Sequence, residues 1–361
     1  GLYGGGWKLY DYATGNVVQQ RGKSGGNVVA VSFAPDGESL VLAQKGEGFD
    51  VLKIGGDPLI KRSPDHTLGS MSVQFSPDGN YFASAGFDGR LLLRRATDGS
   101  SVWALSVGDY RLVRTTFNPD GSTLAVYSSD EVISFVDVSS GRLKQSLSLP
   151  IYSYGMKFTP DGKYLSAPTR DGPIHLVNPE TAKIEKSVTL DNGEYVIALN
   201  FDPNSNRAWM MDHFMNIWSW SWEKNEPATR RGQVSFGTEA KVTKSIYNST
   251  VSPDGRKLVI SVGDGTILCC TPEPFQQLYT AQVGEGPIVN SAFGRSSGFF
   301  VCGTGDGMLC FVDAATGEVV KKQRAHDAAI VAVAVSPDGR NIVTSAVDGE
   351  FRSWSAPTFM Y

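Results

Sequence analysis

The sequence predicts an all-β fold built from one unit that is repeated along the chain. Eight times a phenylalanine or valine precedes a tight polar turn, most often Ser-Pro-Asp-Gly, and all but one of the intervals between them are 41 to 43 residues long. No segment shows the i, i+3, i+4, i+7 apolar spacing of a helix. Such a period indicates units that bury their apolar faces only against their neighbours. The residues before the turns, which number the repeats one to eight, are Phe33, Phe75, Phe117, Phe158, Phe201, Val251, Phe293 and Val335.

The last repeat shows the expected elements in order. Ile330 to Val335 is apolar throughout, as in a strand buried on both faces, and it ends at the Ser-Pro-Asp-Gly turn of residues 336–339. Ile342 to Ser345 is the second strand, and Phe351 to Ser355 alternates as a third strand after a short hairpin. Val319 to Gln323, between repeats, is a fourth. Four short antiparallel strands in roughly 42 residues are typical of a blade of a β-propeller.

Eight turn motifs predict a single β-propeller domain over residues 1–361, with eight blades of four antiparallel strands. Seven blades plus an extra repeat is the alternative. Asn16 to Gln20 is expected to close the ring as the outermost strand of the last blade, which would remove open sheet edges. Residues 1–15 then either pack outside the ring or remain from repeats further upstream. The blades are expected to begin near residues 28, 70, 112, 153, 196, 246, 288 and 330.

The composition of the chain restricts the classes of partner and the cellular compartment that we expect. The net charge is -4 and the lysines and arginines are scattered, so no nucleic-acid partner is expected. No stretch of 18 apolar residues predicts a membrane span. No signal peptide is visible, which favours the cytoplasm, but the chain begins without Met, so an exported or periplasmic location stays open. Buried free thiols are expected for the four cysteines, with a metal site or disulfide as the alternatives: Cys269, Cys270, Cys302 and Cys310.

The sequence carries no recognisable catalytic or cofactor motif. Its four histidines lie in different repeats and form no ligand set, and the expected first strands are nearly free of histidines and carboxylates. No G-x-S-x-G elbow, Cys/His signature or phosphate-binding glycine loop before a helix is present. We therefore expect a non-catalytic protein without metal or cofactor. A ligand-binding, cofactor-binding or catalytic propeller that uses its central channel is the alternative.

Counted from Val335, the last repeat places His326 at minus nine, Thr344 at plus nine, Asp348 at plus 13 and Trp354 at plus 19. This spacing resembles the His, Ser/Thr, Asp, Trp tetrad of the WD-repeat (WD40-like) family. The resemblance covers roughly residues 5–357 and implies that the tetrad side chains form a buried hydrogen-bonded chain with a structural role. Repeat two keeps three members and has Arg94 where tryptophan would be. The expected tetrad residues are His326, Thr344, Asp348 and Trp354, with His66, Ser84 and Asp88 in repeat two.

In this family, partners commonly dock on the face formed by the loops that enter each first strand and by the hairpins between second and third strands. Repeats three to six place tyrosine, arginine and histidine at the positions that should point there, and tyrosine and arginine are enriched at interface hot spots. We therefore expect a scaffold that binds a protein or peptide, within a multiprotein assembly. A second candidate surface is the longer connection from Glu223 to Lys244, which carries Arg230 and Arg231. The expected partner-binding residues are Arg111, Tyr152, Tyr154, Arg170, Tyr195, His213 and Tyr247.

Overall fold

The structure is a computed structural model, and its described residues contain strands, no α-helix and one short 3-10 helix, η2 (Thr358–Met360). The all-β prediction is confirmed. The chain divides into two compact units, the first running to Ser187 and the second starting at Val188, and each is described by itself. The described residues are 5–10, 17–24, 28–44, 48–53, 60–63, 66, 70–151, 155–224, 226–236, 246–288, 290–336, 338–346 and 351–360.

The first unit contains a hairpin and four sheets of four strands, each paired in chain order. The hairpin consists of β1 (Gly5–Tyr10) and β2 (Val17–Ser24). The sheets are β3 (Val28–Phe33), β4 (Ser39–Gln44), β5 (Gly48–Lys53) and β6 (Ile60–Ser63); β7 (Ser70–Phe75), β8 (Tyr81–Gly86), β9 (Arg90–Arg95) and β10 (Ser101–Ser106); β11 (Leu112–Phe117), β12 (Thr123–Ser128), β13 (Val132–Asp137) and β14 (Arg142–Ser148); and β15 (Lys157–Phe158), β16 (Leu165–Pro168), β17 (Ile174–Asn178) and β18 (Lys183–Val188).

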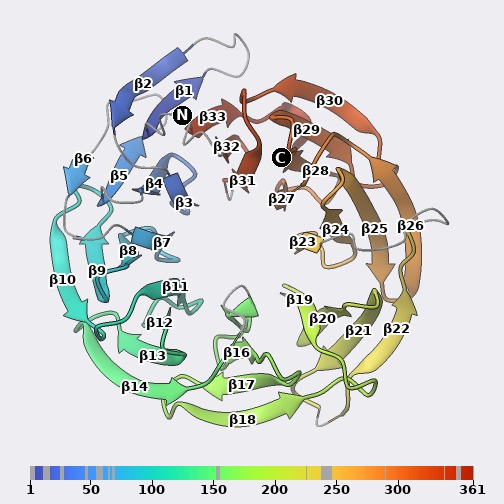
Figure 1. Cartoon of the computed structure of the whole chain (residues 1–361), viewed down its shortest axis with the longest axis horizontal. Helices are drawn as coiled ribbons and strands as arrows, with labels where there is room; N and C mark the ends of the chain where they lie inside the picture. Colours follow the sequence, from blue (N-terminus) through green and yellow to red (C-terminus); the bar gives the residue numbers. More distant parts are fainter. Residues whose placement is uncertain are drawn as a thin grey trace. The chain divides into compact units, whose positions relative to one another are not determined.

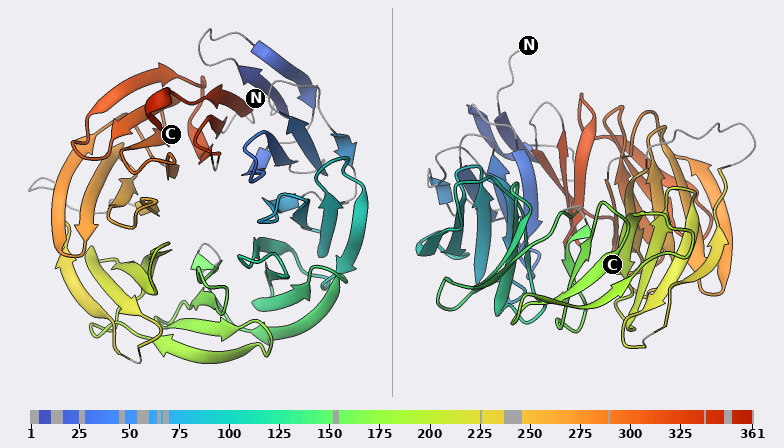
Figure 2. Two further views of the ribbon diagram at one scale, coloured as in Figure 1. Left: turned by 180° about the vertical axis from the view of Figure 1, so that it is seen from behind. Right: turned by 60° about the horizontal axis from the view of Figure 1, so that its bottom comes forward.

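The second unit contains three sheets of four strands and three further strands (Figures 1 and 2). The four-stranded sheets are β19 (Val196–Phe201), β20 (Arg207–Asp212), β21 (Asn216–Ser221) and β22 (Thr229–Gln233); β23 (Ile246–Val251), β24 (Leu258–Val262), β25 (Thr266–Pro272) and β26 (Phe275–Gln282); and β27 (Asn290–Phe293), β28 (Phe299–Gly303), β29 (Met308–Asp313) and β30 (Val319–Arg324). The further strands are β31 (Ile330–Val335), β32 (Asn341–Ala346) and β33 (Phe351–Ser355).

Each of the eight predicted first strands is present, and seven of them open a complete four-stranded antiparallel sheet. The blade of four antiparallel strands is therefore confirmed. Seven complete sheets with additional strands near the chain ends fit the alternative of seven blades plus an extra repeat. The segment expected to close the ring, Asn16 to Gln20, contributes to β2, which pairs with β1. An eighth closed blade and a single domain over residues 1–361 would both require contacts between the two units. Because each unit is described by itself, both stay predictions.

Two first strands begin later than the blade boundaries expected near residues 153 and 288. In repeat four, β15 has two residues, and its partner strand β16 ends at Pro168, which has no N–H to donate to the ladder. In repeat seven, the Ile288 N–H donates to the Val262 carbonyl of the preceding sheet (3.2 Å), and β27 starts at Asn290.

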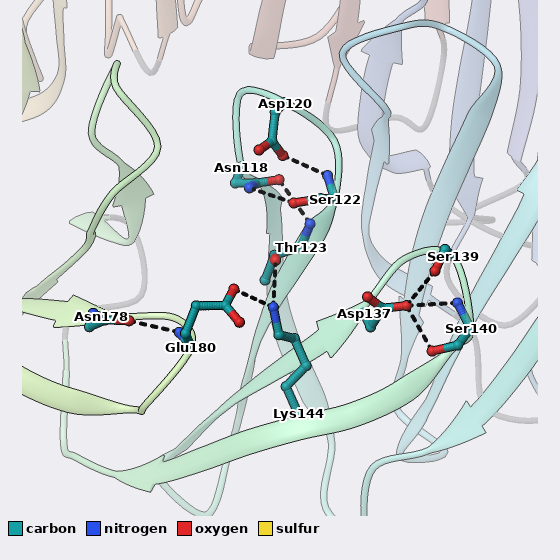
Figure 3. A network of polar contacts seen from close by, with 10 residues as sticks. All are labelled: Asn118, Asp120, Ser122, Thr123, Asp137, Ser139, Ser140, Lys144, Asn178 and Glu180. Atoms are coloured by element: carbon teal, nitrogen blue, oxygen red, sulfur yellow. Dashed lines mark hydrogen bonds and ion pairs between the residues drawn. The ribbon is translucent and has the colours of Figure 1, made fainter.

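The repeated polar turn is held by its serine and aspartate side chains. In repeat two, Ser76 Oγ donates to Asp78 Oδ1 (2.5 Å) and accepts from the Tyr81 N–H (3.0 Å). Gly79 has φ of 73°, which favours glycine over residues with a Cβ. Repeat three has an Asn118–Asp120–Ser122 version of this turn (Figure 3). The turn recurs because these side chains form hydrogen bonds with backbone N–H groups at the point where the chain reverses after the first strand.

Side chains on the first strands join neighbouring sheets of the first unit. The Phe75 N–H donates to Ser32 Oγ (3.0 Å), and the Phe117 N–H donates to Gln74 Oε1 (3.1 Å). First strands are edge strands of their sheets, so one side of their backbone finds no partner within the sheet. The preceding repeat supplies that partner.

The outer strands contact the next sheet through the turn between its third and fourth strands. Trp103 Nε1 donates to the Val138 carbonyl (2.8 Å), and in the second unit the Tyr279 hydroxyl donates to the Asp313 carbonyl (3.4 Å). Lys144 forms an ion pair with Glu180 at the corresponding place (Figure 3). The same contact is thus made by an aromatic residue in some repeats and by an ion pair in another.

Candidate functional site

The tetrad residues of repeat two form a buried hydrogen-bonded chain. His66 Nε2 lies 2.9 Å from Ser84 Oγ, and His66 Nδ1 lies 3.0 Å from Asp88 Oδ1. Burial lowers the pKa of His66 below its ordinary value of 6.5, and the hydrogen bond and charge of Asp88 oppose that shift only in part. The imidazole is therefore neutral near pH 7 and acts as a structural link between two elements of the sheet.

Arg94 occupies the position where the family has tryptophan. Its Nη1 donates to the Gly99 carbonyl (2.7 Å), and its guanidinium lies 5.1 Å from the centre of the Phe49 ring. The side chain is buried, and burial lowers its pKa. A stacked guanidinium thus takes the space of the indole in this repeat.

In the last repeat, His326 Nε2 lies 2.7 Å from Thr344 Oγ1, which also accepts the indole N–H of Trp354 (3.0 Å). All three side chains are buried. Asp348 lies outside the described residues. The histidine, threonine and tryptophan are therefore joined through one hydroxyl oxygen.

Repeat five has a different buried network, centred on Asp212, that the sequence analysis did not identify. Asp212 Oδ2 accepts from Asn192 Nδ2 (2.8 Å), Asn216 Nδ2 (2.8 Å) and Trp218 Nε1 (3.0 Å). Its Oδ1 accepts the N–H groups of Phe214 and Asn216, both at 2.9 Å. Burial would raise the pKa of Asp212, but the hydrogen bonds from Asn216, Trp218 and Asn192 outweigh it and hold the pKa below 3.8. The carboxylate is ionised and anchors the β20–β21 hairpin.

In the second unit, two predicted partner-binding residues lie together in an exposed aromatic cluster. The Tyr195 ring stacks on the His213 ring, with centroids 5.2 Å apart and planes 17° apart, and the Phe214 ring lies 4.1 Å from the His213 ring. Tyr195 is 38% exposed and Phe214 is 52% exposed. His213 Nδ1 lies 2.8 Å from a carboxylate oxygen of Glu194. Tyr195, His213, Phe214 and Glu194 are called the aromatic cluster below.

Tyr247 lies in β23, and nothing is described of its side chain. The sequence analysis did not identify Phe214, which stands where repeats two and eight have the aspartate of the tetrad. A large apolar residue in a hairpin whose neighbours are aromatic was the signal that could have identified it.

In the first unit, Arg111 and Arg170 both contact the β12–β13 hairpin. The Arg111 guanidinium lies 5.2 Å from the centre of the Phe87 ring, and its carbonyl accepts the Ser129 N–H (2.8 Å). Arg170 forms an exposed ion pair with Glu131 (3.4 Å). The structure thus brings these two predicted residues to one hairpin. Tyr152 and Tyr154, also predicted for this surface, lie outside the described residues.

Two first strands of the first unit carry cations that the sequence analysis did not single out. Arg114 lies in β11 and Lys157 in β15. Burial, together with the positive charge of Arg114, lowers the pKa of Lys157 to about 8. The first strands are poor in histidines and carboxylates, as expected, but they do contain ionisable groups.

The four cysteines are free and buried, which agrees with the predicted thiols. Burial raises the pKa of Cys269 to about 11 and that of Cys270 to about 12. Within the described ranges, no group of three or more histidine, cysteine, aspartate or glutamate side chains is placed to hold a metal ion. No helix among the described residues is long and apolar enough to cross a membrane.

Two family models match parts of the chain. The anaphase-promoting complex subunit 4 WD40 domain matches residues 73–153, and the WD domain, G-beta repeat matches residues 317–355. The U3 small nucleolar RNA-associated protein 21 of Saccharomyces cerevisiae is 35% identical over 74 residues, which are 20% of this chain and 8% of that protein. The guanine nucleotide-binding protein subunit beta of Arabidopsis thaliana is 25% identical over 313 residues, which are 80% of this chain and 81% of that protein.

The matches reach only part of the first curated relatives, covering 8%, 35% and 14% of their lengths. Among solved structures, Chaetomium thermophilum Sqt1 bound to the N-terminus of ribosomal protein L10 superimposes with a TM-score of 0.75. The sequence identity is 17%, and the match covers 92% of this chain and 97% of that one. Sheet topology and structural likeness agree that the fold is a β-propeller, and the family models show that parts of the chain are similar to WD repeats.

Proposed function

We propose that the chain is a non-catalytic interaction scaffold that binds a protein or peptide through the aromatic cluster of Tyr195, His213, Phe214 and Glu194. The observation that carries this proposal is the exposure of two large aromatic rings that both contact one histidine. Exposed aromatic rings with a polar handle are the side chains that dominate binding hot spots. Tyr195 lies in the loop that enters β19, and Phe214 lies in the β20–β21 hairpin, as expected for a docking face.

The buried network beneath the cluster supports the same function. Asp212 accepts the Phe214 N–H, and the Met215 N–H donates to the Asp212 carbonyl (3.0 Å), while Met215 has φ of 68°. A left-handed backbone at a bulky residue is unfavourable and persists only where the surroundings impose it. The hairpin is thus held in a conformation that keeps the Phe214 ring at the surface.

The other predicted partner-binding residues stay candidates within their own units. Arg111 and Arg170 lie at one hairpin of the first unit, and Tyr152, Tyr154 and Tyr247 have equivalent sequence positions in repeats four and six. The L10 complex of Sqt1 supports a peptide partner, because it has a similar fold. We propose that the partner belongs to a multiprotein assembly and that the compartment is the cytoplasm.

The test compares the partners captured by wild type with those captured by a Tyr195→Ala, Phe214→Ser double variant. We expect the double variant to lose at least one captured protein, because removing two hot-spot rings costs roughly 2–4 kcal/mol of binding free energy. Ile184→Ser is the matched control, since Ile184 is also exposed (41%) but lies on the outer strand β18. Retention of every partner by the double variant would show that the aromatic cluster does not bind them.

A further inference from the structure

In the sheet β19–β22, the end of β21 alternates indole and hydroxyl side chains. In β21, Trp218 and Trp220 are 1% and 4% exposed, and they alternate with Ser219 and Ser221. Successive side chains of a strand point to opposite faces of the sheet. The indole rings therefore fill one face, and the serine hydroxyls lie on the other.

The strand register and one hydrogen bond place two arginines on the hydroxyl face. Arg207 is the cross-strand partner of Ser221, and Thr229 is the cross-strand partner of Ser219. Arg231 lies at a bulge in β22, and its Nε–H donates to Ser219 Oγ (2.6 Å). A serine hydroxyl that accepts from a guanidinium keeps its own O–H for another acceptor. Guanidinium and hydroxyl donors thus gather on one face of the sheet.

This face forms the wall of a small pocket of about 80 Å³. Three cations line or border it, and the turn after β21 adds one acid and a proline to the rim. This volume lies below the range of drug-sized ligand sites and suits a small ion. The lining residues are Arg207, Ser219, Ser221, Lys224, Glu226, Pro227, Thr229 and Arg231.

Two carboxylates, one in the lining and one beside it, accompany the three cations of the pocket and leave an excess of positive charge. Glu273, in the turn after β25, forms an ion pair with Arg207 and lies 3.6 Å from Arg231. In the first unit, the corresponding contact between an outer strand and the next turn pairs one cation, Lys144, with one acid, Glu180 (Figure 3). Among the described residues at this pocket, Arg207, Arg231 and Lys224 are accompanied by two carboxylates, Glu226 and Glu273. The imbalance favours a further anion.

We propose that this pocket binds a phosphate group. A tetrahedral oxyanion offers several acceptor oxygens, which match two guanidinium groups, an ammonium group and three hydroxyls better than a single carboxylate would. The phosphate is either free inorganic phosphate or the phosphorylated side chain of a protein. This site is separate from the aromatic cluster and does not depend on the function proposed there.

The first experiment titrates the folded full chain with sodium phosphate by calorimetry at pH 7.5, with sodium chloride added to hold ionic strength constant. Wild type should show saturable binding, and Arg231→Met should weaken it by about tenfold or more, as expected for the loss of one charge-assisted contact. Arg230→Met is the matched control and should bind as wild type does, because Arg230 pairs across the strand with Trp218 on the opposite face. Absence of saturable binding to wild type, or equal binding to Arg231→Met, would overturn the proposal.

Two further variants keep the test decisive. Glu273→Gln should strengthen phosphate binding severalfold, because it removes the resident competitor for both arginines. If Arg231→Met does not fold, Ser219→Ala with Ser221→Ala replaces it and should weaken binding about threefold or more. Unchanged affinity in the serine variant, or weaker affinity in Glu273→Gln, contradicts the assignment.

A second titration separates the two sources of phosphate. An acetylated Ala-phosphoserine-Ala amide that binds about tenfold tighter than inorganic phosphate identifies a phosphorylated protein as the ligand, and equal affinity identifies free phosphate. The Tyr195→Ala, Phe214→Ser variant should bind phosphate as wild type does. Its behaviour in the capture experiment and in this titration therefore tests the two sites independently.

Discussion

Repeats two and five each contain a buried polar network. At two equivalent positions of these networks, the larger and the smaller side chain are exchanged between the repeats. In repeat two, a large His66 packs on Gly86, where an added Cβ would lie 2.2 Å from His66 Nδ1. In repeat five, the equivalent positions carry the shorter Asn192 and the larger Asp212, which hydrogen-bond at 2.8 Å. The two positions are 20 residues apart and compensate each other in volume, as expected in a close-packed interior.

The same comparison explains why repeat five, unlike repeat two, has the aromatic cluster at its hairpin. In repeat two the carboxylate belongs to Asp88, in the hairpin itself, where it accepts from His66 and from the Arg90 N–H. In repeat five the carboxylate has moved two residues earlier, to Asp212, and the hairpin position is taken by Phe214, which is 52% exposed. Moving the acid into the strand frees the hairpin for a side chain that can contact a partner.

Placing the repeat-five residues at positions 66 and 86 of repeat two tests whether the two positions compensate each other. Gly86→Asp alone should lower the free energy of unfolding by about 4 kcal/mol, because it forces a carboxylate against the His66 ring and Asp88. Adding His66→Asn should recover about 2 kcal/mol, since the asparagine amide leaves space and donates to the new carboxylate. Urea unfolding of wild type, both single variants and the double variant measures this coupling. Strictly additive losses would show that the two positions do not compensate.

The anchoring role of the buried acid is tested by Asp212→Ala. This change leaves the amide groups of Asn192 and Asn216 and the indole N–H of Trp218 without their acceptor, and it should cost about 3 kcal/mol of unfolding free energy. Asp98→Ala is the control, because Asp98 accepts from the Ser100 N–H in an exposed turn, and it should leave the free energy of unfolding nearly unchanged. Similar losses in chemical denaturation would contradict the special role of the network.

The sequence predicted the repeating elements closely, because turn residues and apolar runs act locally. The runs expected at Ile330 to Val335 and Phe351 to Ser355 coincide with β31 and β33, and the run from Ile342 to Ser345 lies within β32. The tetrad spacing likewise located His66, Ser84 and Asp88, which the structure joins by hydrogen bonds. Features that repeat in sequence are therefore the ones that sequence reasoning recovers.

The candidate sites were harder to predict, because they depend on departures from the repeat. The exchange that places Asp212 opposite Asn192 becomes visible only when two positions 20 residues apart are seen in contact. The polar pocket of repeat five had a local signal, the strict alternation of tryptophan and serine from Trp218 to Trp222, which indicates two unlike sheet faces. The net charge of this pocket also depends on Glu273, which belongs to another repeat of the sequence.

The prediction with the smallest expected effect concerns pH. The two networks should differ in the pH range in which they lose folding stability. Because the pKa of His66 is lowered in the folded chain, the unfolded chain binds more protons below the ordinary histidine value of 6.5, and stability falls as pH decreases through that range. The pKa of Asp212 is also lowered, but the stability that it contributes is present above pH 3.8 and is lost only at lower pH. Between pH 7 and 5, His66→Gln should therefore remove up to about 1 kcal/mol of the acid-induced loss, measured by urea unfolding at each pH. His175→Gln is the reference, because the pKa of that half-buried imidazole is lowered by burial as well. If the pH dependence of His66→Gln matches that of wild type, the neutral imidazole of repeat two is not the origin of the acid sensitivity.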